Sequence, residues 1–330
     1  MGESVSFGWP RRSGLSVPTV GFVIEARGLT KDYGSKRAVD ELSFVVRPGV
    51  VTGFLAPNGS GKSTTMRMIL VLDAPTAGTV VVNGKRYRDL VAPLHEVGAL
   101  LEARSVHTGR SAFNHLLALA QTHGISRSRV DELIDLVGLH EVARQRAGKF
   151  SLGMGQRLGI ATALLGDPAT LLLDEPVNGL DPEGIHWIRN LLRALAGEGR
   201  TVFVSSHLMA EMSLTADHLI VIGRGRLIAD TSVEDFVRRA SSNVVRVRAP
   251  EAIRLRELLL GPGVSVVSPE ASMLEITGIT PQVVGETAAA NNIVLHELAP
   301  LQASLEEAFM ELTRDDVEYK AGSVAETVAA

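Results

Sequence analysis

Apolar runs that end in polar residues recur along much of the chain. Residues 50–55 and 169–173 each have the composition of a short strand that is apolar over most of its length, and residues 200–207 form a further predicted strand with an apolar centre at 202–204. Such strands are typical of a parallel sheet buried on both faces, and the residues that follow them gather at the carboxyl edge of the sheet. The pattern therefore predicts an α/β domain whose polar chemistry is collected at that edge.

Two stretches of the same part of the chain differ from this pattern. Residues from about 22 to 83 are rich in β-forming positions and include a hairpin at 79–84, where an Asn-Gly pair follows alternating apolar residues. Residues from about 102 to 166 lack strand signals and place apolar side chains at helical spacing, for example over 130–137. A β-rich segment and a helical subdomain are therefore predicted beside the parallel sheet.

A second, smaller unit is predicted over residues 241–313. Its elements are strand, helix, strand, strand, helix and strand, followed by one more helix, over residues 244–248, 251–260, 264–267, 274–277, 281–290, 293–298 and 304–312. This β-α-β-β-α-β order defines a small α+β split-βαβ domain. It carries no catalytic constellation, so we expect it to serve dimer contact or regulation, with a stabilising appendage as an equal alternative.

Composition narrows the class of protein. A chain of 330 residues with 45% hydrophobic content can bury one full domain and a small second one. It contains no uninterrupted apolar stretch near 18 residues, so no transmembrane helix is predicted. The net charge of −4 does not indicate a nucleic-acid-binding surface. The absence of cysteine excludes disulfides and thiolate metal sites. Residues 1–21 are expected to form a flexible leader and residues 314–330 a flexible tail.

A phosphate-binding loop is predicted between the strand at 50–55 and a helix at 63–70. Its residues are Asn58, Gly59, Ser60, Gly61, Lys62, Ser63 and Thr64. Small residues let successive backbone N–H groups turn inward around an anion, and the helix aims its positive end at the same point. Lys62 would reach the β- and γ-phosphates, and the Ser63 hydroxyl would bind Mg²⁺. A glycine-rich turn with an incidental lysine is the alternative for this segment.

Polar residues that follow the next two strands complete the predicted site. Asp174 would hold Mg²⁺ through water, and Glu175 would polarise the attacking water. Charged residues that simply mark a surface edge are the alternative, which the neighbouring phosphate loop disfavours. A histidine after a strand is more often structural than catalytic, but the position of His207 favours a contact with the γ-phosphate.

Together with Phe150-Ser151-Leu152-Gly153-Met154, a variant of the L-S-G-G-Q signature, these motifs resemble the nucleotide-binding subunits of ABC (ATP-binding cassette) transporters. The resemblance runs from about residue 23 to 234 and implies a P-loop NTPase domain over 22–240. That fold has a mixed sheet core, an antiparallel β-subdomain and a helical subdomain at about 102–166. The helical subdomain would present the signature to a partner subunit.

The resemblance also implies further site residues. Ser151 and Gly153 would face the γ-phosphate of ATP bound to the other subunit, as a second helix N-terminus facing an anion. Asp181 lies in the loop that links the two sites across such a dimer, and His207 corresponds to the switch histidine. Tyr33 corresponds to the aromatic residue that stacks on adenine, although an ordinary turn aromatic is the alternative.

Three positions depart from the family pattern. Ala56 replaces the first glycine of the phosphate loop, and it fits only with a negative φ or modest strain, so weaker or slower nucleotide binding is expected. Glu102 stands where the family places a glutamine that contacts Mg²⁺ and the lytic water; a carboxylate can ligate the metal, but its charge could slow turnover. Val71 replaces a common glycine, so the phosphate-loop helix is expected to end less cleanly.

More narrowly, the chain looks like the bacterial antibiotic-exporter branch of the daunorubicin and bacitracin resistance type. This implies an ATPase that uses ATP and Mg²⁺, dimerises head to tail with its own copy, and drives efflux of a drug, antibiotic or lipid-like substrate through a separate integral-membrane permease. Such a subunit is cytoplasmic and peripheral on the inner face of the cell membrane. A non-transport ABC ATPase is the main alternative, whereas a kinase or GTPase is disfavoured because no Asn-Lys-x-Asp motif occurs.

Overall fold

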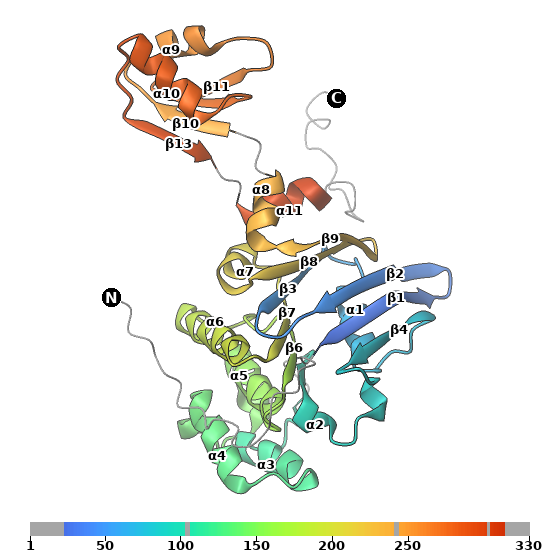
Figure 1. Cartoon of the computed structure of the whole chain (residues 1–330). Helices are drawn as coiled ribbons and strands as arrows, with labels where there is room; N and C mark the ends of the chain where they lie inside the picture. The colour runs from blue at the N-terminus through green and yellow to red at the C-terminus, as the bar shows by residue number, and fades with distance from the viewer. Residues whose placement is uncertain (1–22, 103–105, 241–243, 302–303, 314–330) are drawn as a thin grey trace, which may run out of the picture. The chain divides into compact units, whose positions relative to one another are not determined.

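The computed structural model describes residues 23–102, 106–240, 244–301 and 304–313 (Figure 1). The predicted leader and tail therefore lie outside the described residues. Contacts divide the described residues into two compact units, one that ends at Ser232 and one that begins at Val233. This division falls before the predicted boundary at residue 241. Helix α8 (Val233–Ala240) belongs to the second unit because it packs against α11 (Leu305–Thr313).

The core of the first unit is a six-stranded sheet with the order β5-β6-β7-β3-β8-β9. Its strands are β3 (Val51–Leu55), β5 (Val97–Leu100), β6 (Thr170–Asp174), β7 (Thr201–Ser205), β8 (His218–Gly223) and β9 (Arg226–Ser232). All neighbouring pairs are parallel except β8 with β9, which confirms the mixed sheet. Every residue of β3 and β7 is buried, as expected for strands covered on both faces.

A three-stranded antiparallel sheet forms the predicted β-subdomain. Its order is β2-β1-β4, with β1 (Ile24–Tyr33), β2 (Lys36–Val46) and β4 (Ala77–Val82). Three rings join the two sheets: the centroid of Phe203 lies 5.8 Å from that of Phe44 and 5.0 Å from that of Phe54. Aromatic pairs at this spacing add a packing preference to their large buried area, so the two sheets are firmly attached to each other.

The helices of the first unit include the predicted helical subdomain. They are α1 (Lys62–Ile69), α2 (Pro93–Glu96), α3 (Ala112–Thr122), α4 (Arg127–Leu136), α5 (Leu152–Ala163), α6 (Pro182–Gly197) and α7 (Met209–Thr215), with short 3₁₀ turns η1 (Tyr87–Asp89), η2 (His140–Val142) and η3 (Ala147–Lys149). Helices α3, α4 and α5 pack on one another. Each begins at a serine that accepts a backbone N–H three residues later, at Ser111, Ser126 and Ser151.

The second unit contains the predicted split-βαβ fold. Its elements after α8 are β10 (Val244–Arg248), α9 (Ala252–Leu259), β11 (Ser265–Glu270), β12 (Met273–Thr277), α10 (Pro281–Ala290), β13 (Glu297–Leu301) and α11 (Leu305–Thr313). The antiparallel sheet has the order β11-β12-β10-β13, which confirms the predicted arrangement. The last strand begins at Glu297 and not at 293, because Asn292 has a φ of +53° and ends α10 in a turn.

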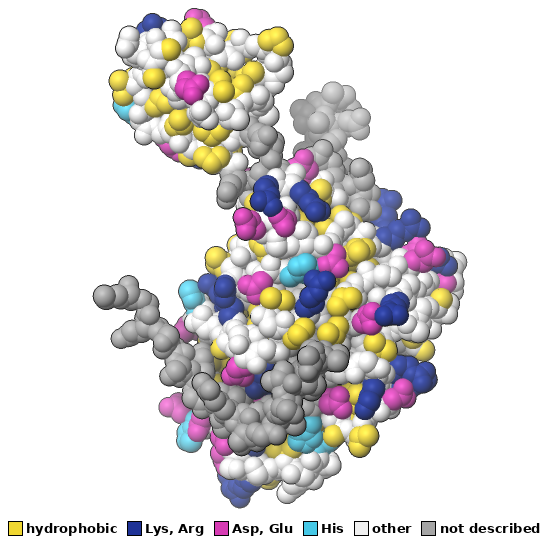
Figure 2. Space-filling model, in the orientation of Figure 1, with side chains coloured by type: hydrophobic (Ala, Val, Ile, Leu, Met, Phe, Trp, Pro, Cys, Tyr) yellow, Lys and Arg dark blue, Asp and Glu magenta, His cyan; other side chains and the backbone are white. Residues whose placement is uncertain are grey.

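The surface of the first unit is mixed in charge. On the face shown in Figure 2, acidic and basic side chains lie among one another, with apolar side chains between them. Ion pairs of this unit include Arg37 with Asp32 and Arg226 with Asp40. In the part of the chain that the structure describes, no helix is both long enough and apolar enough to cross a bilayer.

Candidate functional site

The predicted phosphate loop connects the buried strand β3 to helix α1. Gly59 and Gly61 have φ values of +81° and +91°, a conformation that glycine adopts more easily than other residues. A Cβ on Gly61 would also lie 2.3 Å from the Ala38 carbonyl oxygen, so no side chain fits there. Gly61 is the N-cap of α1 and supplies no side-chain hydrogen bond, which leaves the first N–H groups of the helix available to an anion.

The departures from the family pattern near this loop have different consequences. Ala56 is not among the described residues with positive φ, and it packs against the hydrophobic core, so the alanine is accommodated without a left-handed backbone. Val71 has a φ of +57°. Helix α1 nevertheless ends in a regular cap, in which the Leu72 N–H donates to the Arg67 carbonyl at 2.9 Å. The cost of Val71 is therefore strain in one β-branched residue and not an irregular helix end.

The acidic pair at the end of β6 meets the phosphate loop. The Lys62 Nζ lies 2.5 Å from Glu175 Oε1. The Ser63 hydroxyl lies 3.2 Å from Asp174 Oδ2, to which it donates a hydrogen bond. The structure thus brings together four predicted residues from segments more than 100 positions apart in the sequence.

His207 joins this group through Glu175. Its backbone N–H donates to Glu175 Oε2 at 3.2 Å, and its Nδ1 lies 2.7 Å from the same oxygen. Burial raises the pKa of the Glu175 carboxyl, but the hydrogen bonds and charges of Lys62 and His207 outweigh burial and lower the pKa from its ordinary value. Glu175 is therefore held as a carboxylate with a cation on one oxygen and an imidazole on the other.

A cavity of about 500 Å³ lies beside these residues, a size suited to a small-molecule ligand. The residues of the predicted site that line it are Tyr33, Asn58, Gly59, Gly61, Lys62, Ser63, Thr64, Asp174 and Glu175. Lys36 also lines the cavity and was not predicted; its position three residues after Tyr33 was the signal in the sequence. Ser60 is buried instead, and its carbonyl accepts the Gly225 N–H at 3.1 Å.

Tyr33 lies at the end of β1 and is half exposed. Its hydroxyl donates to Asp73 Oδ2 at 3.1 Å, and the Lys31 Nζ lies 4.9 Å from the ring centroid. Partial burial, followed by the hydrogen bond and charge of Asp73, raises the pKa of Tyr33. The phenol is therefore a fixed, neutral ring in the wall of the cavity.

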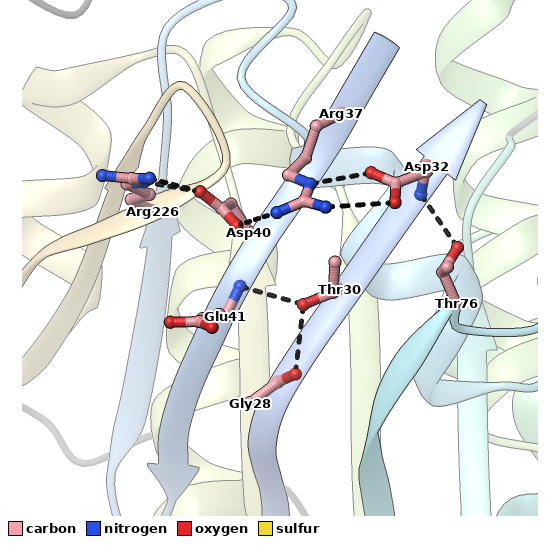
Figure 3. A network of polar contacts seen from close by, with 8 residues as sticks. All are labelled: Gly28, Thr30, Asp32, Arg37, Asp40, Glu41, Thr76 and Arg226. Carbon is pink, nitrogen blue, oxygen red and sulfur yellow. Dashed lines mark hydrogen bonds and ion pairs between the residues drawn. The ribbon is translucent and has the colours of Figure 1, made fainter. Parts of the chain in front are cut away.

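A polar network holds the hairpin that carries Tyr33 (Figure 3). Arg37 donates to Asp32 Oδ1 at 2.8 Å and to Asp40 Oδ1 at 2.9 Å, and Asp40 pairs in turn with Arg226 of β9 at 2.6 Å. The Asp32 N–H donates to the Thr76 hydroxyl at 3.0 Å. These contacts tie β1 and β2 to the core sheet and so fix the position of the Tyr33 ring relative to the phosphate loop.

The signature residues lie away from this cavity. Ser151 caps α5 and lines a second cavity of about 250 Å³ together with Thr108, Phe150 and Leu152. A Cβ on Gly153 would lie 2.6 Å from the Gly179 carbonyl oxygen, so the start of α5 approaches the loop before α6 closely. Neither residue lines the cavity beside Lys62. One chain thus carries two separate groups of predicted residues.

Asp181 and Glu102 contribute differently from the other predicted residues. Asp181 caps α6 by accepting the Gly184 N–H at 3.1 Å. Glu102 is exposed and is not among the residues that line the cavity beside Lys62. Glu102 lies close enough to Arg67 to interact with its charge. The hydrogen bond to Asp73 raises the pKa of Arg67, and the negative charge of Glu102 raises this pKa further.

The donor set fits magnesium bound with a nucleotide better than magnesium bound alone. Ser63 and Asp174 offer a hydroxyl and a carboxylate, the oxygen ligands that Mg²⁺ prefers. Among the described residues, no group of three or more histidines and carboxylates could hold a metal ion. Protein sites for Mg²⁺ commonly supply one or two ligands and leave the others to substrate phosphates and water, which matches this arrangement.

Two polar residues that contact the acidic pair were not predicted. The Ser205 hydroxyl donates to Asp174 Oδ1 and accepts the Glu175 N–H at 3.1 Å. The Gln156 Nε2 donates to the Glu175 carbonyl at 2.9 Å. The sequence contained a signal for Ser205, a serine at the end of an apolar strand just before His207. It contained none for Gln156, because no local pattern indicates that this residue contacts the end of β6.

Comparisons with known proteins cover both units. A family model described as ABC transporter matches residues 39–178, and a model described as a domain of unknown function matches residues 243–306. The bacitracin transport ATP-binding protein BcrA of Bacillus licheniformis is 40% identical over 220 residues, which cover 66% of this chain and 72% of that protein. The uncharacterized ABC transporter ATP-binding protein YhcH of Bacillus subtilis is 35% identical over 302 residues, 90% of this chain and 97% of its own.

A solved structure shares the fold. The structure of an ATP binding subunit of an ABC transporter superposes with a TM-score of 0.61 and 26% identity, and the match covers 66% of this chain and 92% of that one. The share of this chain that is matched corresponds in size to the first unit.

Proposed function

The chain belongs to the ABC transporter family of ATP-binding proteins, and we propose that it binds and hydrolyses ATP as the motor subunit of an exporter. The observation that carries this proposal is the convergence of Lys62, Ser63, Asp174 and Glu175 on one cavity. A cation, a hydroxyl and two carboxylates beside the N-terminus of α1, which has no side-chain cap, form the donor set that phosphoryl transfer needs.

Each residue then has a defined task. The loop amides and Lys62 bind the β- and γ-phosphates, and Tyr33 stacks on the adenine ring. Ser63 and Asp174 would hold Mg²⁺, which would neutralise charge on the phosphate oxygens. Glu175 accepts a hydrogen bond from the attacking water and orients it, which requires the carboxylate form that its lowered pKa favours.

ATP would also change the contacts of Glu175. Lys62 and His207 both contact its carboxylate in the structure. A γ-phosphate carries more negative charge than a carboxylate and would attract both groups. Glu175 would then be released toward the water, while His207 contacts the γ-phosphate. The contribution of Glu102 to the metal remains a prediction.

A head-to-tail dimer accounts for the separation of the two groups of residues in one chain. Ser151 and Gly153 line or flank a cavity of their own, away from Lys62. In a dimer of this kind, the start of α5 in one copy completes the phosphate site of the other, and the loop containing Asp181 lies between the two sites. The second unit, proposed to extend from residue 241 to 313, would add dimer contact or regulation.

We infer the transport role from the relatives. One of them is a bacitracin transport ATP-binding protein that aligns with two thirds of this chain. By this likeness, the protein drives efflux of a drug, antibiotic or lipid-like substrate through a separate membrane permease and sits on the cytoplasmic face of the membrane. Cargo choice would belong to the permease.

The test uses Glu175→Gln in the full chain, purified with its membrane partner. We expect this variant to bind ATP, to accumulate as a closed dimer on size-exclusion chromatography, and to release no phosphate. Glu141→Gln, which changes an exposed carboxylate in η2, is the matched control and should hydrolyse ATP normally. Near-normal hydrolysis by Glu175→Gln would remove Glu175 from its role, and a flat ATPase response to amphipathic antibiotics would contradict export.

A further inference from the structure

The backbone of Glu175 has an unusual conformation. Its φ is +52°, in the left-handed region that residues with side chains rarely adopt. Such conformations persist only where the surroundings hold them, and they cluster at functional sites. The contacts that hold this residue therefore decide where its carboxylate points.

Hydrogen bonds hold the residue from both sides. The Glu175 N–H donates to the Ser205 carbonyl at 3.2 Å and to the Ser205 hydroxyl at 3.1 Å. The Glu175 carbonyl accepts from Gln156 Nε2 at 2.9 Å. Ser205 stands directly opposite Asp174 in the parallel pairing of β6 and β7, so its hydroxyl contacts both members of the acidic pair.

Both partners are polar side chains inside the protein. Gln156 is 2% exposed and Ser205 is 0% exposed. A buried amide or hydroxyl needs a hydrogen-bond partner to offset its desolvation, and here the partners are atoms of the Asp174-Glu175 segment. Neither side chain lines the cavity beside Lys62, so neither is placed to contact the nucleotide.

Gln156 also connects two parts of the proposed site. It lies on α5 little more than one turn after Ser151, the cap of that helix. A displacement of the first turn of α5 would therefore reach Gln156 and, through its hydrogen bond, the Glu175 carbonyl. Gly153, in the first turn of α5, also lies close to the Gly179 carbonyl. The start of this helix therefore approaches the segment after Glu175 at a second point.

We infer that Gln156 and Ser205 are positioning residues that clamp the Glu175 backbone and aim its carboxylate at the attacking water, and that Gln156 makes this aim depend on the position of α5. The inference rests on the proposed ATPase function. Contact between Ser151 and a phosphate bound to the partner copy then affects Glu175 of the chain that carries Ser151. Hydrolysis at the two sites of the dimer is thereby coupled.

The experiment compares substitutions in the full chain with its membrane partner. Gln156→Leu removes the donor at nearly constant volume. Thr162→Val is its matched control, because Thr162 lies on the same helix and its hydroxyl donates only locally, to the Leu158 carbonyl at 2.9 Å. Ser205→Val and Ser205→Thr form a second pair with equal volume, in which only threonine keeps the hydroxyl.

The expected results separate positioning from binding and from folding. Gln156→Leu and Ser205→Val should lower kcat by about 10- to 100-fold, the size of effect seen when a reacting group is misplaced. The Kd for ATP should change by less than about threefold, because neither side chain touches the nucleotide. Gln156→Leu should also lower the Hill coefficient for ATP toward 1, and Ser205→Thr should retain more activity than Ser205→Val.

Each outcome has one meaning. If Gln156→Leu keeps the kcat and Hill coefficient of Thr162→Val, or if kcat and ATP affinity fall together, the clamp is contradicted. Equal loss in Ser205→Thr and Ser205→Val contradicts a role for the hydroxyl. Glu175→Gln distinguishes the two levels: full hydrolysis in that variant overturns the proposed function itself, whereas an inactive Glu175→Gln beside a fully active Gln156→Leu overturns the clamp alone.

Discussion

Helices α1 and α5 both begin at the wall of a cavity, but their first turns are built differently. Gly61 starts α1 without a side-chain cap, and a charged group of Lys62, Asp174 and Glu175 lies beside it. Ser151 starts α5 and uses its hydroxyl to accept the Met154 N–H. The N-terminus of α1 offers a cation and uncapped amides, whereas the N-terminus of α5 offers a hydroxyl and little charge. Nucleotide affinity should therefore depend on α1, and assembly of the closed dimer should depend on α5.

Lys62→Ala tests the α1 side of the comparison and should have the largest effect. Loss of the cation removes charge-assisted hydrogen bonds to phosphate and leaves the half-buried Glu175 without its cationic partner. We expect the Kd for ATP to rise by at least about tenfold and kcat to fall by about 10²- to 10³-fold.

Fluorescent-nucleotide titration and phosphate release measure these two changes. Lys85→Ala, at an exposed turn position, is the control and should leave both unchanged. If Lys62→Ala bound ATP as tightly as Lys85→Ala, the cavity beside α1 would not be the nucleotide site.

Ser151→Ala tests the α5 side and should separate binding from turnover. Because Ser151 lies away from the cavity beside Lys62, the Kd of the monomer for ATP should stay the same, while kcat and ATP-dependent dimerisation fall by about 10-fold. The substitution also removes a helix cap, worth about 1 kcal/mol.

A matched variant corrects for the lost cap. Ser126 caps α4 in the same way, accepting the Arg129 N–H at 3.3 Å, and Ser126→Ala therefore carries the same kind of structural loss. Dimerisation measured by light scattering in the Glu175→Gln background should fall for Ser151→Ala only. Equal behaviour of the two alanine variants would assign Ser151 to structure alone.

The sequence predicted the α1 side more completely than the α5 side, for a physical reason. Glycine spacing, the lysine and the strand ends follow from local rules about backbone conformation and burial. The contacts of Glu175 with Gln156 and Ser205 join residues 19 and 30 positions away through tertiary packing, which no periodicity encodes. For the same reason the exposed position of Glu102, and the pairing of α8 with α11 across the boundary set at residue 241, could not be predicted from local pattern.

Of the two helix starts, only that of α1 should make stability depend on pH. The pKa of Glu175 is lowered in the folded protein, so the native state binds this proton less readily than the unfolded chain. The resulting stabilisation is fully present above the ordinary glutamate pKa, about 4.3, and is lost as pH falls through the lower folded value. The difference in free energy of unfolding between wild type and Glu175→Gln should therefore shrink on acidification below about pH 5.

Urea unfolding between neutral and acidic pH measures this difference. Ser151 does not titrate, so the corresponding difference for Ser151→Ala should be constant over the same range. A Glu175→Gln difference that grew on acidification would mean that burial dominates and the pKa is raised.

The smallest effect expected concerns the opposite end of α1. Val71 holds a φ of +57° in the cap of that helix, where glycine avoids a steric penalty of about 1–2 kcal/mol. Glycine also has more conformational entropy in the unfolded chain, which destabilises the folded state by about 0.4–1 kcal/mol. The net result of Val71→Gly should be a stabilisation of the first unit by about 0.5–1 kcal/mol. Calorimetry should register a rise in Tm of about 1–4 °C.

Asn83→Gly is the control for this last substitution. Asn83 has a similar φ of +53°, but asparagine tolerates that region, and its Oδ1 accepts the Val23 N–H at 3.1 Å. Glycine there relieves little strain and loses a hydrogen bond, so it should not stabilise. Val71 does not line the cavity beside Lys62, and ATP affinity should therefore stay constant in Val71→Gly. A change in affinity would show that strain at the end of α1 reaches its N-terminus, and the helix would then act as one unit with the phosphate loop.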